Sequence, residues 1–377
     1  MESYGPPEFG ITMVQTYGYV EIEYAAVRKS AALFDWPFRG TIEITGADRH
    51  AFLGRMLTQE LKNWPMHTAR RSFWLNRKGR IDADLRLINL PDRVIADVDA
   101  LAATRAVETL SSYAVMDDVA IVDITTTMHR LGLHGPASAR LLSLCVPPAD
   151  APAALSLERG VALPTSIAGC SVIVDRWDAT GEIGLELWCA AADAQAIYTE
   201  LLVRGTPENA KPIVRPAGWA AFNIARIEAG TPFYNLDFGP DTLPAETGLL
   251  NDRVSFTKGC YLGQEIVARL HALGHPKRVL VGLDIESVIA EGPEAFPRQP
   301  ETGSLIYAAE TSAALAASAQ SVGAVTSATL SPMLGNKPVA MAMVKWASSP
   351  AGTPLMVDCQ ATLTPAKVHS ALNMLTR

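Results

Sequence analysis

The sequence has few cysteines, and none of them is placed for a disulfide framework or a zinc site. The 377-residue chain contains five: Cys145, Cys170, Cys189, Cys260 and Cys359. The number is odd, the gaps are long and no pair has CxxC spacing, so neither a disulfide framework nor a classical metal site is expected. This use of cysteine is typical of a reduced cytoplasmic protein. A functional cysteine would act alone or with a partner from outside the chain.

The sequence also lacks a long hydrophobic run and an excess of basic residues. No stretch approaches the roughly 18 consecutive apolar residues of a membrane-spanning helix. The N-terminus has no basic region followed by an apolar run, so a secretory signal is not expected. The formal charge of −7, from 32 basic and 39 acidic residues, argues against direct nucleic-acid binding. We therefore expect a soluble cytoplasmic protein with no membrane partner.

What the chain does contain is enough apolar material for more than one core. Apolar residues make up 49% of the sequence and charged residues 19%. Because cores stop growing near about 250–300 residues, two or three domains are expected. Strand and helix patterns over 1–275 predict two interleaved α+β domains, divided near 125–150. Short strands punctuated by glycine and proline over 276–377 predict a C-terminal small β-barrel.

The N-terminal patterns make specific predictions about single elements. Apolar residues at three- and four-residue spacing predict a helix over 20–34. Alternation of polar and apolar residues predicts a strand over 40–45 with one buried face. Asp48 is a candidate N-cap residue for a helix over 49–56.

The most informative segment is Lys258-Gly259-Cys260-Tyr261-Leu262-Gly263-Gln264-Glu265, followed by Arg269. From Tyr261 onward the pattern predicts a helix in which Glu265 and Arg269 form an i, i+4 salt bridge. Cys260 would then lie at the helix N-terminus, which favours negative charge and, with Lys258, would stabilise a thiolate. The alternative is that Cys260 is a small buried residue, as free cysteines often are.

This segment resembles the K-G-C-[YF]-x-G-Q-E-x-x-x-R signature of the YgfZ/IBA57 family. These proteins are folate-binding relatives of the glycine-cleavage T-protein, an aminomethyltransferase. Further matches lie between about residues 20 and 345: Asn76 to Ile81, Thr180 to Glu186, Arg226 to Gly230 and Leu243 to Leu249. The resemblance implies an α+β fold of three domains in an aminomethyltransferase-like ring, with the small barrel at the C-terminus and tetrahydrofolate in a central channel.

The resemblance also implies residues that contact the folate. Glu186 matches a carboxylate that hydrogen-bonds the pterin, and Arg226 matches an arginine near the folate. A carboxylate can accept two parallel N–H bonds from an aminopyrimidine edge, and an arginine can pair with the folate carboxylates. The alternatives are a surface position for Glu186 and a core ion pair with Glu228 or Asp237 for Arg226. Candidate aromatic walls of the cofactor site are Trp36, Phe222 and Tyr234, and the alternative for each of them is an ordinary position in the core.

The function implied by the resemblance is to assist the maturation or repair of iron–sulfur enzymes, with a link to tRNA modification. Folate and iron–sulfur client or assembly proteins would be the partners. Because the common clusters need about four thiolate ligands, this chain alone would not hold a cluster, which would be transient, shared or held by a partner. The hypothetical roles are an essential thiol at Cys260, a thiolate-holding charge at Lys258, close backbone approach at Gly259 and Gly263, and support of the motif by Tyr261, Gln264, Glu265 and Arg269.

Two departures from the aminomethyltransferases keep other functions open. The position of Cys260 is typically an aspartate in the T-protein, and the position of its catalytic aspartate falls on Ala106, with Asp97 or Asp99 as substitutes. A folate-dependent aminomethyl or methyl transferase is therefore the second hypothesis. A scaffold that keeps the fold without binding folate is the third.

Overall fold

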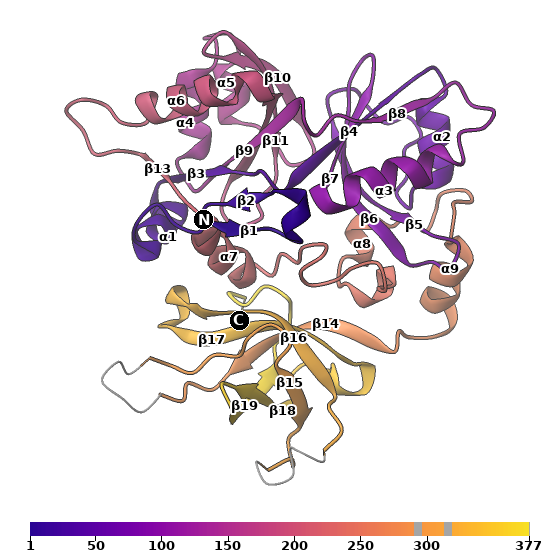
Figure 1. The fold of residues 1–377 in the computed structure, drawn as a ribbon, viewed down its shortest axis with the longest axis vertical. Helices are drawn as coiled ribbons and strands as arrows, with labels where there is room; N and C mark the ends of the chain where they lie inside the picture. Colours follow the sequence, from indigo (N-terminus) through magenta and orange to yellow (C-terminus); the bar gives the residue numbers. More distant parts are fainter. Residues whose placement is uncertain (290–295, 313–318, 377) are drawn as a thin grey trace. The chain divides into compact units, whose positions relative to one another are not determined.

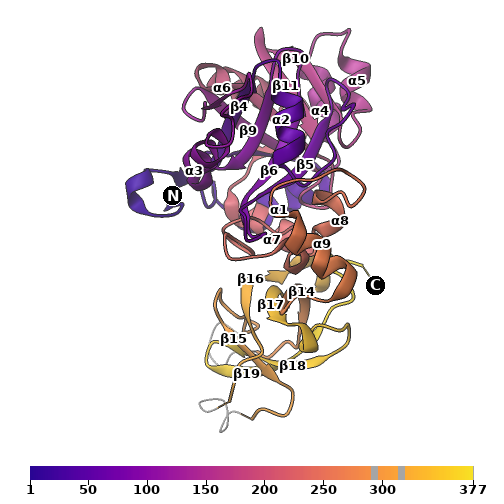
Figure 2. The ribbon, with the colours of Figure 1, turned by 90° about the vertical axis from the view of Figure 1, so that its right-hand side faces the viewer.

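The computed structural model describes residues 1–289, 296–312 and 319–376. These residues form two compact units, each built from separate segments of the chain (Figure 1, Figure 2). The first unit consists of Met1–Asn76, Asp82–Phe222 and Asn251–Leu262, and the second of Arg77–Ile81, Asn223–Leu250 and Gly263–Arg377. Because neither unit is one continuous segment, the domain boundaries expected from the sequence stay a prediction.

The first sheet has five strands in the order β5-β6-β7-β4-β8. Their bounds are Ala69–Leu75, Ile81–Asn89, Val94–Asp99, Arg39–Thr45 and Ala120–Asp123, and the associated helices are α2 (Arg49–Met56) and α3 (Ala100–Ser111). The strand predicted over 40–45 and the helix predicted over 49–56 are confirmed as β4 and α2. Asp48 is the N-cap residue of α2, as predicted, but its side chain accepts a hydrogen bond from the backbone amide of Asp118 and not from the first turn of the helix.

The helix predicted over 20–34 is too long. Helix α1 ends at Lys29 after starting at Val20, and residues Ala31–Asp35 form strand β3. Residues 31–34 are all fully buried because β3 lies inside a sheet, between β9 (Met128–His134) and β13 (Val214–Pro216). A short run that is apolar on both faces has no period of two, so spacing alone cannot distinguish it from a helix.

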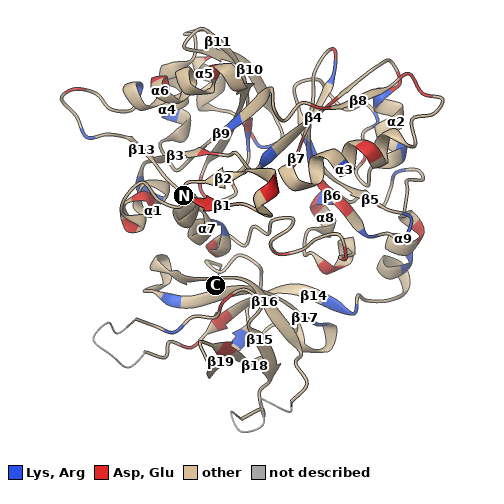
Figure 3. Cartoon of the chain, in the orientation of Figure 1, with Lys and Arg blue, Asp and Glu red and all other residues tan. Residues whose placement is uncertain are grey.

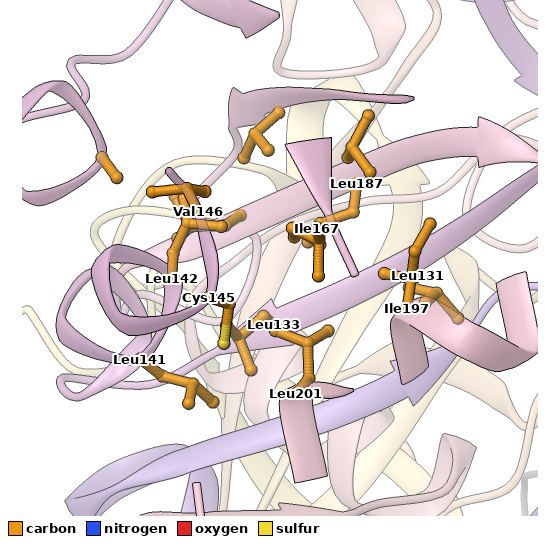
Figure 4. Packing of buried hydrophobic residues seen from close by; sticks show 14 of the residues in the cluster. Leu131, Leu133, Leu141, Leu142, Cys145, Val146, Ile167, Leu187, Ile197 and Leu201 are labelled. Atoms are coloured by element: carbon orange, nitrogen blue, oxygen red, sulfur yellow. The ribbon is translucent and has the colours of Figure 1, made fainter. Parts of the chain in front are cut away.

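The second sheet has six strands in the order β10-β11-β12-β9-β3-β13. The strands not yet given are β10 (Ala162–Ile167), β11 (Cys170–Arg176) and β12 (Gly184–Ala190), and the helices near this sheet are α4 (Ser138–Cys145), α5 (Ala151–Leu155) and α6 (Ala194–Arg204). Alternate residues in β9 and β12, namely Leu131, Leu133, Leu185 and Leu187, pack into one core with α4 and α6 (Figure 4). The opposite face of these strands carries charged and aromatic side chains.

The second unit contains a closed barrel with the strand order β14-β17-β16-β15-β18-β19. The bounds in that order are Arg278–Ile285, Lys337–Lys345, Gly323–Ser331, Leu305–Ala308, Pro354–Cys359 and Thr362–Val368. Inward residues such as Leu283, Val325 and Val357 form its core. The expectation of mixed α and β structure ending in a small β-barrel is confirmed.

Three helices connect these parts of the chain: α7 (Trp219–Glu228), α8 (Leu250–Arg253) and α9 (Gln264–Leu273). A short hairpin at the N-terminus pairs β1 (Glu2–Ser3) with β2 (Thr12–Met13). Acidic and basic residues are interspersed in both units (Figure 3). Within the described ranges, no helix combines the length and the apolar character needed to cross a membrane.

Candidate functional site

Glu186 lies on the charged face of the six-stranded sheet. It is flanked in register by Asp175 on β11 and by Gly132 on β9, so all three positions share one face. The neighbours of Glu186 in sequence, Leu185 and Leu187, point into the apolar core on the other side. Because Glu186 is only 1% exposed, the alternative of a surface position is wrong.

The carboxylate of Glu186 is only partly satisfied by the protein. Its Oε1 lies 3.1 Å from Nε2 of His134, whereas Oε2 has no hydrogen-bond partner in the described part of the chain. Burial alone would raise the pKa of Glu186, but the bond to His134 and the charges of Arg86 and Arg130 lower it below its usual value. Glu186 is therefore an ionised acceptor with one oxygen left for a ligand.

Arg130 stands beside Glu186 and is fixed by two other groups. Its Nη2 lies 2.8 Å from Oδ1 of Asp97, and its guanidinium stacks 3.6 Å from the ring centre of Trp188. Asp97 also pairs with Arg39 at 2.6 Å. Although burial opposes it, the charges of Arg130 and Arg39 hold the pKa of Asp97 well below its usual range. The side chain of Arg130 is thus held by an ion pair and by stacking, whereas its Nε, Nη1 and Nη2 all lack a hydrogen-bond partner among the described residues.

Further charges extend this cluster toward β6 and β11. Arg86 pairs with Asp175 at 3.0 Å, and Asp175 also accepts a hydrogen bond of 2.8 Å from the indole of Trp188. Burial raises the pKa of Asp175 and lowers that of Arg71. Sequence reasoning missed Arg86, Arg130 and Asp175. Charged residues that alternate with apolar ones form the same sequence pattern whether their face of the strand is open to water or covered by other parts of the protein.

The aromatic residues predicted to line the site fall into different places. Trp36 is buried, stacks on Phe34 at 4.9 Å and meets the edge of Phe222 at 4.7 Å. Its indole lies over Gly132, where a Cβ would collide with the ring nitrogen. Tyr234 belongs to the second unit, where its hydroxyl donates to the carbonyl of Ile81 at 3.3 Å. Of the three aromatic residues predicted to line the site, Trp36 and Phe222 therefore belong to the same unit as Glu186.

Arg226 is held inside the second unit by protein groups. It is fully buried and pairs with Asp237 at 2.6 Å. Its other hydrogen bonds reach Asn223, the carbonyl of Thr231 and the hydroxyl of Ser327. These contacts fit the alternative of a core ion pair with Asp237, and they leave the folate contact of Arg226 a prediction that no contact supports.

Lys258 does not hold a thiolate in the predicted way. Its Nζ donates to three backbone carbonyls: those of Gly54 at 2.8 Å, Leu57, and Gln59 at 3.0 Å. These oxygens lie at or just beyond the C-terminal end of α2, where carbonyls lack helical partners and a cation is favoured. Burial lowers the pKa of Lys258 to about 8, which leaves it mostly charged at neutral pH. Its role is to anchor the 252–262 segment to α2.

Cys260 is exposed and lies outside the helix that was expected to begin there. Helix α9 starts only at Gln264, after Gly263 with a φ of 78°. The argument for a thiolate at a helix N-terminus therefore fails, as does the alternative of a buried cysteine. The thiol instead stands on a loop held by Lys258 and by a hydrogen bond from the Leu262 amide to the carbonyl of Arg55.

The other motif residues have separate roles. Gly263 needs its left-handed backbone conformation to turn the chain into α9, whereas a Cβ at Gly259 would meet no atom within 4 Å. Close backbone approach is therefore not the reason for Gly259. Tyr261 is buried, with the Lys258 ammonium 5.2 Å from its ring centre. Gln264 is the first residue of α9.

The salt bridge predicted between Glu265 and Arg269 does not form. Both side chains are exposed on α9, and no ion pair joins them in the described residues. Exposed i, i+4 pairs contribute only about 0.3–0.5 kcal/mol, so spacing alone does not ensure contact. Glu265 and Arg269 do not brace the Cys260 loop through this pair.

The carboxylates considered for one-carbon transfer are already engaged. Asp97 pairs with two arginines, and Asp99 accepts from the Tyr4 hydroxyl and from the amide of Leu101 as the N-cap of α3. Ala106 is buried within α3. Within residues 1–289, 296–312 and 319–376, no group of three or more His, Cys, Asp or Glu side chains is placed to hold a metal ion.

Two family models match nearly the whole chain. Residues 4–258 match the GCVT N-terminal domain, and residues 278–372 match the glycine cleavage T-protein C-terminal barrel domain. The second match coincides with the barrel formed by β14 to β19. The two matches follow the order of the chain and leave only short segments uncovered.

Individual relatives match over similar lengths. The aminomethyltransferase of Pseudothermotoga lettingae is 30% identical over 336 residues, covering 89% of this chain and 84% of the relative. That of Halalkalibacterium halodurans is 28% identical over 355 residues, covering 93% and 89%. The crystal structure of the glycine cleavage system aminomethyltransferase T from Bartonella henselae has a TM-score of 0.80 at 25% identity, covering 96% of this chain and 91% of that one.

Proposed function

Since the chain belongs to the glycine cleavage T-protein family, we propose that it binds a tetrahydrofolate and takes part in the transfer of a one-carbon unit. The observation that carries the proposal is the free oxygen of Glu186, an ionised and buried acceptor held by His134. A buried acceptor without a partner costs free energy unless a ligand or a water satisfies it. An aminopyrimidine edge offers the N–H groups that such a carboxylate needs.

Each residue of this face has a defined task in the proposal. Glu186 accepts N–H bonds from the pterin, and His134 orients the carboxylate through Oε1. Trp36 and Phe222 supply buried aromatic surface on the same unit. The folate, when bound, supplies the nitrogen atoms that carry the one-carbon unit.

The first test is a calorimetric titration of the full chain with tetrahydrofolate and with 5-formyltetrahydrofolate. Glu186→Gln keeps the shape of the side chain but removes its charge, and we expect it to weaken binding by at least about tenfold. Glu265→Gln is the matched control, because Glu265 is exposed and makes no ion pair in the described residues. Equal binding by both variants would refute the role of Glu186, and absence of binding by the wild type would refute the function.

For the reaction, the comparisons support transfer of an aminomethyl or methyl group to the folate, because the relatives are named aminomethyltransferases. The test is turnover of a methylamine-type donor in the presence of tetrahydrofolate, followed by the folate product. We expect Glu186→Gln to lose turnover together with folate binding. A wild type that binds folate but does not turn over any such donor would contradict the transferase function alone.

A second candidate function is a YgfZ-like accessory role for iron–sulfur enzymes, and Cys260 favours it. This thiol is exposed on a loop anchored by Lys258, while Asp97 and Asp99 are occupied by protein partners. The test is the activity of iron–sulfur enzymes in cells that contain only Cys260→Ser. Loss of that activity, with folate binding intact, would favour the accessory function. Unchanged activity would eliminate it.

A further inference from the structure

A cavity beside helix α2 contains none of the residues to which the proposed function assigns a task. Its volume is about 460 Å³, and every residue that lines it belongs to the first unit. The lining comes from α2 and from residues 60–64 of the loop that follows this helix. On α2 it includes Ala51 and Gly54, and a Cβ at Gly54 would meet no atom within 4 Å. Because pockets for small ligands begin at about 300 Å³, this space is too large for a single water to fill.

The shape of the loop is fixed by Asn89, the last residue of β6. Its Nδ2 donates to the carbonyls of Trp64 at 2.9 Å and of Pro65 at 3.2 Å. Both amide hydrogens are then used, so Oδ1 is the acceptor that lies 2.8 Å from Nε2 of His50. Neutral His50 therefore carries its proton on Nε2 and keeps Nδ1 as an acceptor. Asn63 adds a left-handed turn, with a φ of 54°, which asparagine tolerates.

A buried donor without a partner lines the cavity. The indole nitrogen of Trp64 has no hydrogen-bond partner in the described part of the chain, and the residue is only 6% exposed. The rings of Trp64 and His50 meet edge to face with 6.2 Å between their centres, so the indole donor and the imidazole acceptor belong to adjacent rings. A buried N–H without an acceptor is costly, and a ligand in the cavity can supply the missing oxygen.

The lining also carries one charge of each sign. Oε1 of Glu60 accepts from the backbone amide of Lys62 at 2.8 Å, and within the described residues neither side chain forms an ion pair. Burial lowers the pKa of Lys258 and the charge of Glu60 opposes that shift, but Nζ of Lys258 already donates to three carbonyls. A ligand of one sign would be attracted by one of the two lining charges and repelled by the other. A ligand that carries both charges can pair with both.

We propose that this cavity binds a free α-amino acid with an apolar side chain. The carboxylate of the ligand accepts from the indole N–H of Trp64 and pairs with Lys62. Its ammonium group pairs with Glu60 and donates to Nδ1 of His50. The apolar side chain of the ligand lies against Leu61 and the small residues of α2. This inference does not depend on the proposed folate binding, because the two sites share no residue.

The test follows the indole N–H signals of the full chain, labelled with ¹⁵N at tryptophan, during a titration with L-leucine. The chain has seven tryptophans, and the Trp64 signal is identified by its loss in Trp64→Phe. We expect leucine to shift this signal in a saturable way. The ligands 4-methylpentanoate and 3-methylbutylamine each lack one of the two charges of leucine, and each should bind at least about tenfold more weakly.

Substitutions in the lining test the same contacts from the protein side. Gly54→Leu places a side chain in the empty space and should abolish the leucine-dependent shift, while thermal unfolding shows that the variant folds. Glu60→Gln and Lys62→Met each remove one charge and should weaken leucine binding about tenfold. Lys211→Met is the matched control, because Lys211 is exposed and does not line the cavity.

Each outcome decides for or against the proposal. Absence of a leucine-dependent shift in the wild type would refute it. If 4-methylpentanoate or 3-methylbutylamine binds as tightly as leucine, the cavity does not recognise both charges and the assignment to an amino acid fails. Unchanged leucine binding in a folded Gly54→Leu would place the ligand elsewhere. If Gly54→Leu does not fold, the losses in Glu60→Gln and Lys62→Met, compared with Lys211→Met, still decide.

Discussion

At Glu186 the ionisable groups are buried and some of their polar atoms lack hydrogen-bond partners in the described residues, whereas at Cys260 the thiol is exposed and the nearby buried ammonium of Lys258 makes three hydrogen bonds. Glu186 and Arg130 each keep atoms without a hydrogen-bond partner among the described residues. Lys258, two residues before Cys260, donates to three carbonyls. The first region therefore holds buried polar atoms that the described protein groups leave without hydrogen bonds. The second presents a thiol on a fixed support, to be reached from outside.

The difference also concerns what each region costs the fold. Buried charges on the sheet are stabilising only in pairs, and removing one member leaves another without compensation. The loop depends instead on one ammonium that donates to uncharged carbonyls at a helix end, so its removal leaves no charged group without compensation. Substitutions at the charged face should therefore lower the free energy of unfolding more than substitutions at the Cys260 loop.

The largest effect is expected for Asp97→Ala. This change leaves Arg39 and Arg130 without their shared carboxylate, and we expect it to destabilise the fold by about 3–5 kcal/mol in urea unfolding. Asp241→Asn, at a side chain that is 92% exposed, serves as the control and should leave the unfolding midpoint unchanged. A loss of less than about 1 kcal/mol in Asp97→Ala would show that the charged face does not depend on this pair.

The same carboxylate makes a prediction for pH. The pKa of Asp97 is lower in the folded state than in the unfolded chain, because of Arg130 and Arg39. Its contribution is therefore fully present above the unfolded value of about 4 and is lost as the pH falls toward the folded value. Stability measured between about pH 5 and pH 2 should fall less steeply in Asp97→Ala than in the wild type. Parallel curves would contradict the assignment.

A smaller effect is expected for Lys258→Met. The three carbonyls near the end of α2 lose a common donor, which should cost about 1–3 kcal/mol. Hydrogen exchange should also become faster in residues 252–262 before it changes elsewhere. Lys62→Met, at an exposed lysine, is the control and should change neither quantity. Unaltered exchange in Lys258→Met would mean that other contacts hold the loop.

Alanine substitutions at the two glycines of the motif should differ by about 1 kcal/mol in their effect on the free energy of unfolding. Gly263→Ala forces a side chain into a left-handed conformation, with a φ of 78°, and should destabilise the fold. Gly259→Ala places a methyl group where no atom lies within 4 Å, so the unfolding midpoint should stay the same or rise slightly. Equal losses in both variants would contradict this account of the turn.

The smallest effect on stability is expected for Cys260→Ser, within about 0.5 kcal/mol of the wild type. The thiol reagent DTNB should find one fast-reacting cysteine in the folded protein, because Cys260 is exposed while Cys145, Cys189 and Cys359 are buried. Cys170 is half-buried, and burial and the nearby Asp193 raise the pKa of its thiol, so it should react more slowly than Cys260. Burial raises the pKa of Cys145 and Cys189 to about 12, which slows them further. Cys260→Ser should remove the fast phase, and its persistence would place the reactive thiol elsewhere.

Much of the fold could be predicted from local patterns, but the charged face could not. The strand β4, the helix α2 and the C-terminal barrel follow periodicities that a single segment contains. The strand β3 was predicted as part of a helix, because its burial on both faces depends on neighbours far away in sequence. Arg130 stands in a stretch with leucine and glycine, and only the folded structure shows that its face of the strand is covered and not open to water.

The candidate site was also predicted only in part from the sequence. Glu186 was found through resemblance, and its burial and free oxygen needed the structure. The position of Cys260 was misplaced because the helical pattern from Tyr261 onward ignores the left-handed turn at Gly263. Lys258 was assigned to the thiol because it is near in sequence, whereas its ammonium reaches carbonyls some 200 residues earlier, with sequence separations of 199 to 204.

The division of the first unit into separate chain segments has a consequence for biosynthesis. Residues 251–262 return to this unit after the chain has already entered the second one. Arg253 bonds to Asp84 at 2.8 Å, and Lys258 closes the end of α2. During translation, a nascent chain that stops at residue 222 lacks both contacts, so the unit must wait for more of the polypeptide before it can complete its fold.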